Sequence, residues 1–169
     1  MDLQISVFLL FILFTAGHSL RCYECTDMTG PCDQKVKTCP SGSSQCMTAT
    51  QIWTIKNCAA ACQSMSMNFG IGKTTTSCCS SDLCNAQDPP EPVPNGKKCY
   101  YCDGKSCSNT VSCSGTEDHC FKAIDKGGLT NLNGCVSKSV CDVATSGTDF
   151  VSFICCEGNL CNGLPELHI

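Results

Sequence analysis

The side chains of this chain best suited to chemistry are its cysteines, which number 20 among 169 residues. Two pairs, Cys22 with Cys25 and Cys99 with Cys102, have the Cys-x-x-Cys spacing found in zinc sites and in thiol–disulfide redox motifs. Both uses require thiolates. A cysteine content of about 12% is instead typical of a disulfide scaffold, and because the number is even, every cysteine can have a partner. We therefore predict structural disulfides, with no metal and no other cofactor.

The histidines and acidic residues do not form a recognisable catalytic set. After the N-terminal segment the chain has His119, beside Cys120, and His168 near its end. A hydrolase needs a histidine that is oriented by a second group and lies next to a nucleophile, and the sequence suggests no such arrangement. The adjacent acidic pair Glu117 and Asp118 is expected to form a solvated turn, and His119 is expected to be solvated as well. The sequence thus predicts that the protein is not an enzyme.

One cysteine pattern occurs twice and divides the chain into two modules. Residues 78–85 read Cys-Cys-Ser-Ser-Asp-Leu-Cys-Asn, and residues 155–162 read Cys-Cys-Glu-Gly-Asn-Leu-Cys-Asn. The two copies are 77 residues apart, and the same offset separates Cys22 from Cys99 and Cys25 from Cys102. We place module 1 at residues 20–85 and module 2 at residues 97–162, with half of the cysteines in each.

Residues 86–96 join the two modules, and four of these eleven residues are proline. Because proline fixes φ and has no N–H donor, we predict an extended, semi-rigid linker without a helix or a paired strand. Each module has 66 residues, and a domain of that size buries only about 60% of the surface that its unfolded chain exposes. Five disulfides in each module, each contributing roughly 2–4 kcal/mol, are expected to compensate for the small core.

The two ends of the chain predict secretion. Residues 5–14 are apolar except for Ser6, a run shorter than the roughly 20 residues that cross a bilayer. With the small and polar residues that follow, it is typical of a signal peptide, which we assign to residues 1–19. The C-terminal tail, residues 163–169, lacks the hydrophobic stretch of about 10–20 residues that a glycolipid anchor signal needs. We therefore expect a secreted, extracellular protein without a membrane anchor, in agreement with the oxidising compartment that disulfides require.

The formal net charge is −4, but each module is close to neutral: module 1 has five basic and four acidic residues, and module 2 has six basic and seven acidic residues. Neither module has the cluster of basic residues that binding to nucleic acid requires. We therefore expect no nucleic-acid partner.

The pattern of apolar residues predicts an all-β protein with little helix. Met65, Met67, Phe69 and Ile71 alternate with small or polar residues, as in a half-buried strand. This stripe is either the core side of a strand, which we favour, or an adaptable binding face. Further strands are predicted from β-branched and aromatic content at residues 51–55, 121–124 and 150–154.

Both modules resemble the three-finger domains of the lymphocyte antigen and urokinase receptor (LU) superfamily, to which snake toxin-like domains are related. The resemblance rests on the opening Leu20-Arg21-Cys22-Tyr23-Glu24-Cys25, on Cys99-Tyr100-Tyr101-Cys102, and on the closing Cys-Cys-x4-Cys-Asn of each module. It implies that each module is a knot of five disulfides from which three hairpin fingers project. It also implies that Asn85 and Asn162 bond back to the backbone of the knot.

Ten cysteines alone permit hundreds of pairings, but the resemblance implies one. In module 1 the implied disulfides are Cys22–Cys46, Cys25–Cys32, Cys39–Cys58, Cys62–Cys78 and Cys79–Cys84. In module 2 they are Cys99–Cys120, Cys102–Cys107, Cys113–Cys135, Cys141–Cys155 and Cys156–Cys161.

A rigid display of loops of this kind acts by binding an extracellular protein. Trp53, in the middle of the second finger, is our candidate for partner binding because tryptophan is a favoured interface anchor; packing against a neighbouring sheet or the other module is the equal alternative. The two-module layout looks most like the gamma-type inhibitors of secreted phospholipases A2. The alternatives are a urokinase-receptor-like recognition protein for a protease, an integrin or a gamete surface, and a pheromone-like or receptor-modulating three-finger signal.

Overall fold

The computed structural model describes residues 19–27, 32–125, 131–144 and 150–163. Residues 1–18 of the predicted signal peptide and residues 164–169 of the predicted tail lie outside these ranges. The strands of module 1 are β1 (Arg21–Asp27), β2 (Lys35–Thr38), β3 (Gln45–Thr50), β4 (Thr54–Ala59), β5 (Met65–Asn68) and β6 (Lys73–Cys79). Module 2 consists of β7 (Pro94–Tyr101), β8 (Asn109–Ser114), β9 (His119–Asp125), β10 (Asn131–Val136), the helix α2 (Lys138–Ala144) and β11 (Phe150–Cys156).

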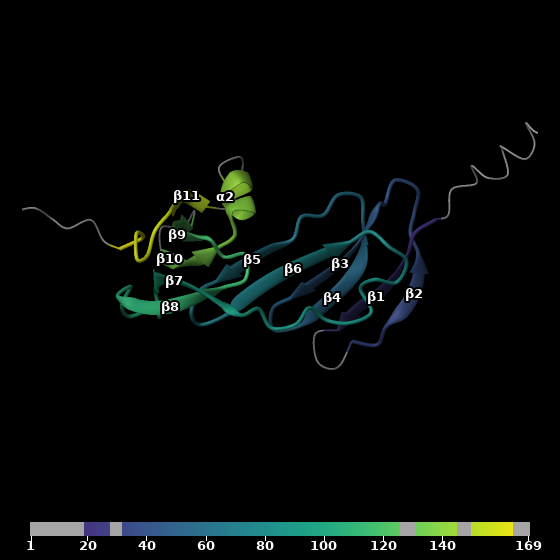
Figure 1. Ribbon diagram of the computed structural model, residues 1–169, viewed down its shortest axis with the longest axis horizontal. Coiled ribbons are helices and arrows are strands. Elements are labelled where there is room, and N and C mark those ends of the chain that lie inside the picture. Colours follow the sequence, from purple (N-terminus) through teal and green to yellow (C-terminus); the bar gives the residue numbers. More distant parts are fainter. Residues whose placement is uncertain (1–18, 28–31, 126–130, 145–149, 164–169) are drawn as a thin grey trace, which may run out of the picture.

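One antiparallel sheet runs through both modules (Figure 1). Among the described residues it has nine strands, in the order β2, β1, β4, β3, β6, β5, β10, β9 and β11, while β7 and β8 form a separate pair. The two modules meet where β5 pairs with β10, with Asn68 opposite Cys135 and Met67 opposite Val136. The modules are therefore docked on each other through a shared sheet.

The fingers are the hairpins of this sheet. In module 1 they are β1–β2, β3–β4 and β5–β6, and in module 2 the first two are β7–β8 and β9–β10. The third finger of module 2 differs, because α2 stands before β11 where a strand would complete the hairpin. The predicted fold class is confirmed: the described residues are all-β with one short helix, and the protein consists of two tandem three-finger domains with five disulfides each.

Two local predictions were wrong. Residues 51–53 form a bend rather than a strand, because the chain reverses there between β3 and β4, and the Gln51 N–H donates to the Trp53 carbonyl at 3.0 Å. In addition, β7 begins at Pro94, inside the predicted linker, with Pro94 opposite Ser114. A proline can be the first residue of a strand, because it has no N–H to donate but keeps a carbonyl that can accept a hydrogen bond. The carbonyl of the neighbouring Val93 accepts from the Gly115 N–H at 2.9 Å.

The predicted strands at residues 121–124 and 150–154 lie within β9 and β11. The buried core is formed mainly by disulfides. One cluster gathers around Cys22, Cys39 and Cys46, and a second around Cys99, Cys113, Cys120 and Cys135. A third cluster consists of Phe121, Ala123 and Val136 and receives side chains from module 1. The core thus links the modules as well as supporting each one.

Candidate functional site

Every cysteine of the chain is in a disulfide, and the ten pairs are those that the family resemblance implies. They are Cys22–Cys46, Cys25–Cys32, Cys39–Cys58, Cys62–Cys78, Cys79–Cys84, Cys99–Cys120, Cys102–Cys107, Cys113–Cys135, Cys141–Cys155 and Cys156–Cys161.

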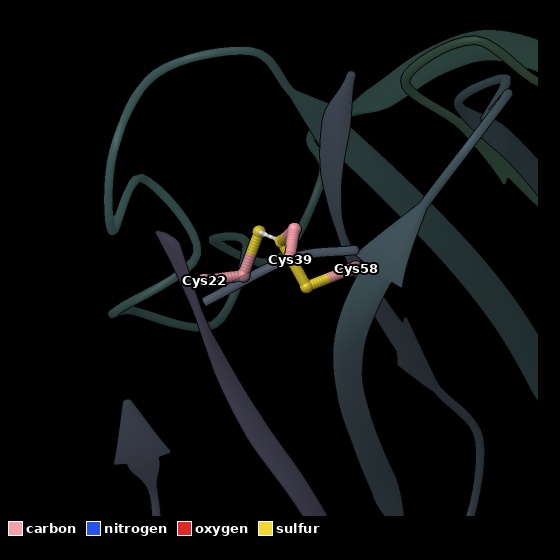
Figure 2. Close-up of side chains that lie close together, drawn as sticks. All are labelled: Cys22, Cys39 and Cys58. Atoms are coloured by element: carbon pink, nitrogen blue, oxygen red, sulfur yellow. Dashed lines mark hydrogen bonds between the residues drawn. A yellow bond between two sulfur atoms is a disulfide. The ribbon is translucent and has the colours of Figure 1, made fainter. Parts of the chain in front are cut away.

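The disulfides bring sulfur atoms close together in each knot. Figure 2 shows Cys22 beside the Cys39–Cys58 bridge, with 3.2 Å between the Sγ atoms of Cys22 and Cys39. The three sulfurs lie within 4.8 Å of one another, a spacing that would suit a metal if they were thiolates. Since Cys22 is bonded to Cys46 and Cys39 to Cys58, these sulfurs carry no thiolate charge. The cluster is therefore the packing of two bridges.

The terminal asparagine of each module holds the knot to the first and second fingers. Asn85 accepts the Tyr23 N–H at 2.9 Å and donates to the Tyr23 and Met47 carbonyls at 2.9 and 3.3 Å. Asn162 makes the same contacts in module 2, accepting the Tyr100 N–H and donating to the carbonyls of Tyr100 and Phe121. Both side chains are buried. Their role is to satisfy backbone groups that would otherwise be buried without partners.

The joint between the modules has two parts, and the first is apolar. Met67 and Phe69 of module 1 pack on the Phe121 cluster of module 2. The Phe121 ring meets Phe69 edge-on at 5.8 Å and stacks on Phe153 at 5.2 Å. The Met65–Ile71 stripe therefore divides, since Met67 and Phe69 enter a core supplied by the other module while Ile71 is exposed.

The second part of the joint is a buried ionic network centred on Glu117. Its fully buried carboxylate accepts from Ser66 Oγ at 2.6 Å and from the Ser114 N–H at 2.8 Å, and it pairs with Lys73 Nζ at 3.0 Å. Ser66 and Lys73 belong to module 1, whereas Glu117 and Ser114 belong to module 2. The expectation that Glu117 is a solvated turn residue was wrong, because partners from the other module replace its water.

His119 is also buried, with 9% of its surface exposed, contrary to the expectation of a solvated side chain. Its Nδ1 lies 3.0 Å from an Asp118 oxygen and its Nε2 lies 3.4 Å from a Glu157 oxygen. Partial burial opposes the ionisation of Asp118, but hydrogen bonds from His119 and from the Lys138 N–H outweigh it and lower the pKa of that carboxyl. These contacts fasten the loop before β9 to the start of α2.

The finger tips of module 1 carry exposed apolar side chains. Ile52 is 86% exposed and Trp53 is 36% exposed at the tip of the second finger, and Ile71 is 72% exposed at the tip of the third. Both tips lie at the same end of the sheet, because β3 and β6 are paired with Thr50 opposite Thr75. Trp53 is thus accessible to a partner, and its role in binding stays a prediction.

Comparison with known proteins assigns the family. A family model described as snake toxin and toxin-like protein matches residues 20–85 and 98–162, most of the chain. The chain belongs to this family. Within the described ranges, no helix of this family member is long and apolar enough to cross a membrane.

Three relatives illustrate how members of this family resemble the chain. Phospholipase A2 inhibitor NAI from Notechis ater is 28% identical over 163 residues, covering 78% of this chain and 82% of the inhibitor. The urokinase plasminogen activator surface receptor of Rattus norvegicus is 24% identical over 187 residues, covering 88% of this chain but 56% of the receptor. Prostate stem cell antigen from Mus musculus is 35% identical over 88 residues, covering 46% of this chain and 72% of that protein.

Proposed function

We propose that the protein is a secreted, non-enzymatic binding protein that inhibits a secreted phospholipase A2. The observation that carries the proposal is the match to the inhibitor NAI, which extends across both modules and most of the inhibitor's own length. Twenty cysteines, all in disulfides, fit an oxidising extracellular environment.

The geometry supports recognition by two modules acting as one body. The shared sheet and the joint centred on Phe121 and Glu117 fix the finger tips of module 1 relative to module 2. A preorganised surface loses less freedom on binding than two independently moving modules would. Ile52 and Trp53 at the second finger tip are the side chains we propose to contact the enzyme.

The test is inhibition of purified secreted phospholipases A2 by the oxidised two-module chain, together with direct binding measured by surface plasmon resonance. Trp53→Ala should weaken binding about 30-fold, as expected for a tryptophan hot spot. Val36→Ala, which removes an exposed side chain from the first finger, is the matched control and should leave binding unchanged. Failure of the wild-type chain to bind any enzyme of a broad panel would overturn the proposal.

The second candidate is a urokinase-receptor-like recognition protein, which the alignment with that receptor over most of this chain favours. A pull-down from extracellular fluid, analysed by mass spectrometry, distinguishes the two. Recovery of a phospholipase that Trp53→Ala loses supports inhibition, whereas recovery of a protease or a membrane receptor supports recognition of that partner instead.

A further inference from the structure

In module 1, the linker lies against one face of the sheet (Figure 1). The side chains of Ser77, Thr48 and Lys56 form one row on that face, because the register places them directly opposite one another across β6, β3 and β4. The fully buried Lys56 side chain extends Nζ to the Ala86 carbonyl and to an Asp88 oxygen, each at 2.9 Å. The segment that crosses this face therefore supplies a carboxylate to the lysine of the row.

Module 2 repeats this row with different side chains. In both modules, each of the three strands has a cysteine two residues from the row, so the positions correspond one to one. The row in module 2 consists of Ile154 on β11, Lys122 on β9 and Asn133 on β10. Ile124, two residues from Lys122 along β9, lies on the same face and corresponds to Thr50 of module 1. Two isoleucines and a lysine thus replace small hydroxyl side chains.

These replacements line an open, mainly apolar groove of about 400 Å³. From the sheet, the lining residues are Lys122, Ile124, Ser152, Ile154 and Cys156, and residues 161–163 complete the lining. Ile154 is 61% exposed, which is unusual for an isoleucine within a strand. The Asn133 Nδ2 donates to the Asn162 carbonyl at 3.3 Å and so attaches the end of the knot to the sheet.

The lysine in this groove lacks the counter-ion that Lys56 has in module 1. Lys122 is half-buried, and it forms no ion pair with any residue that the structure describes. The groove lining contains no acidic residue that could take the place of Asp88. Partial withdrawal of an ammonium group from water costs free energy, which a bound anion offsets. The groove therefore offers one cation beside an apolar surface.

We propose that this groove binds a long-chain fatty acid, with the carboxylate on Lys122 Nζ and the alkyl chain along Ile124 and Ile154. In module 1 the lysine of the row receives its carboxylate from a polar segment. In module 2 the hydroxyl side chains have become isoleucines, which favour an anion with an apolar remainder. The groove volume lies within the range of about 300–1,000 Å³ typical of small-molecule sites. The proposal uses no residue of the phospholipase contact proposed above and does not depend on it.

A peptide would fit this groove less well than an alkyl chain. The backbone of β9 is already paired with β10 on one side and with β11 on the other. The face of the sheet therefore presents side chains and gives a peptide no backbone partners for its own N–H and C=O groups. An alkyl chain needs no such partners, and its removal from water is favourable by itself.

The test is methyl NMR on the oxidised full chain with labelled isoleucine, titrated with sodium myristate below its critical micelle concentration. We expect saturable shifts of the Ile124 and Ile154 methyls, while Ile52 and Ile71 of module 1 stay unchanged. Myristate should bind at least about tenfold more tightly than decanoate, because each methylene that enters the groove adds to the affinity. Shifts that appear only above the critical micelle concentration, or that affect Ile52 and Ile71 equally, would overturn the proposal.

Two substitutions test the recognition of the carboxylate and of the chain separately. Lys122→Gln should weaken the binding of myristate about fivefold, because the charged partner of the carboxylate is lost, and should leave the binding of myristyl alcohol unchanged. Ile154→Ser, which introduces the residue found at the corresponding position of module 1, should weaken the binding of both about tenfold. Lys35→Gln, at an exposed position of β2, is the control and should change neither. Unchanged affinity for myristate in Lys122→Gln or in Ile154→Ser would contradict the assignment of the groove.

Discussion

At the scale of single residues, hydrogen bonding decides which polar side chains this small protein can bury. Asn85 and Asn162 repeat one set of backbone contacts, a role that the family resemblance implies for them. The burial of Glu117 could not be predicted in this way. Its neighbours, Gly115 to Asp118, have the composition of a turn, and its partners Ser66 and Lys73 lie in the other module.

We predict that Glu117→Ala destabilises the protein by about 2–4 kcal/mol, because it leaves the Lys73 ammonium, the Ser66 hydroxyl and the Ser114 N–H without their acceptor. The free energy of unfolding from denaturant titration measures this loss. Glu157→Ala removes a carboxylate that is 81% exposed and should have little effect. Equal effects of the two substitutions would contradict the importance of the network.

At the scale of elements, the alternating pattern located β5, because period-two alternation is a property of the strand itself, and β-branched and aromatic content located β9 and β11. The helix α2 was not predicted, since it is only seven residues long and begins at a cap from elsewhere in the chain: the Lys138 N–H donates to the Asp118 carboxylate at 2.8 Å. Residues 51–53 have strand composition but form the bend at a finger tip. Position in the fold thus overrides local propensity where the chain must turn.

The cap on α2 should depend on pH. Because the pKa of Asp118 is lowered in the folded protein, its contribution to stability is present above its unfolded value, near pH 4, and is lost as the pH falls through the folded value. Asp118→Asn should therefore reduce the slope of stability against pH below about pH 4. Thermal unfolding across this range, with Asp33→Asn as a control in the exposed segment before β2, measures the slope. An unchanged slope in Asp118→Asn would show that the cap does not depend on that charge.

At the scale of the whole molecule, the cysteine pattern and its family resemblance predicted two knots, but nothing in the sequence indicated how the modules are arranged. The linker composition predicted a spacer, while the structure shows modules joined through β5 and β10. That pairing depends on a close approach between the backbones of β10 and β5. Gly134 in β10 faces the backbone of Asn68, and a methyl group at position 134 would overlap the Asn68 carbonyl oxygen.

Gly134→Ala should therefore loosen the joint while leaving each disulfide knot intact. We expect faster amide hydrogen exchange in β5 and β10 and a larger radius of gyration in small-angle X-ray scattering, because the two modules would move apart on their linker. Gly72→Ala, where an added methyl group meets no atom within 4 Å, is the matched control and should preserve both values. If Gly134→Ala kept the exchange protection of the wild-type chain, the close contact at Asn68 would not hold the modules together, and the preorganisation argued for partner binding would need another source.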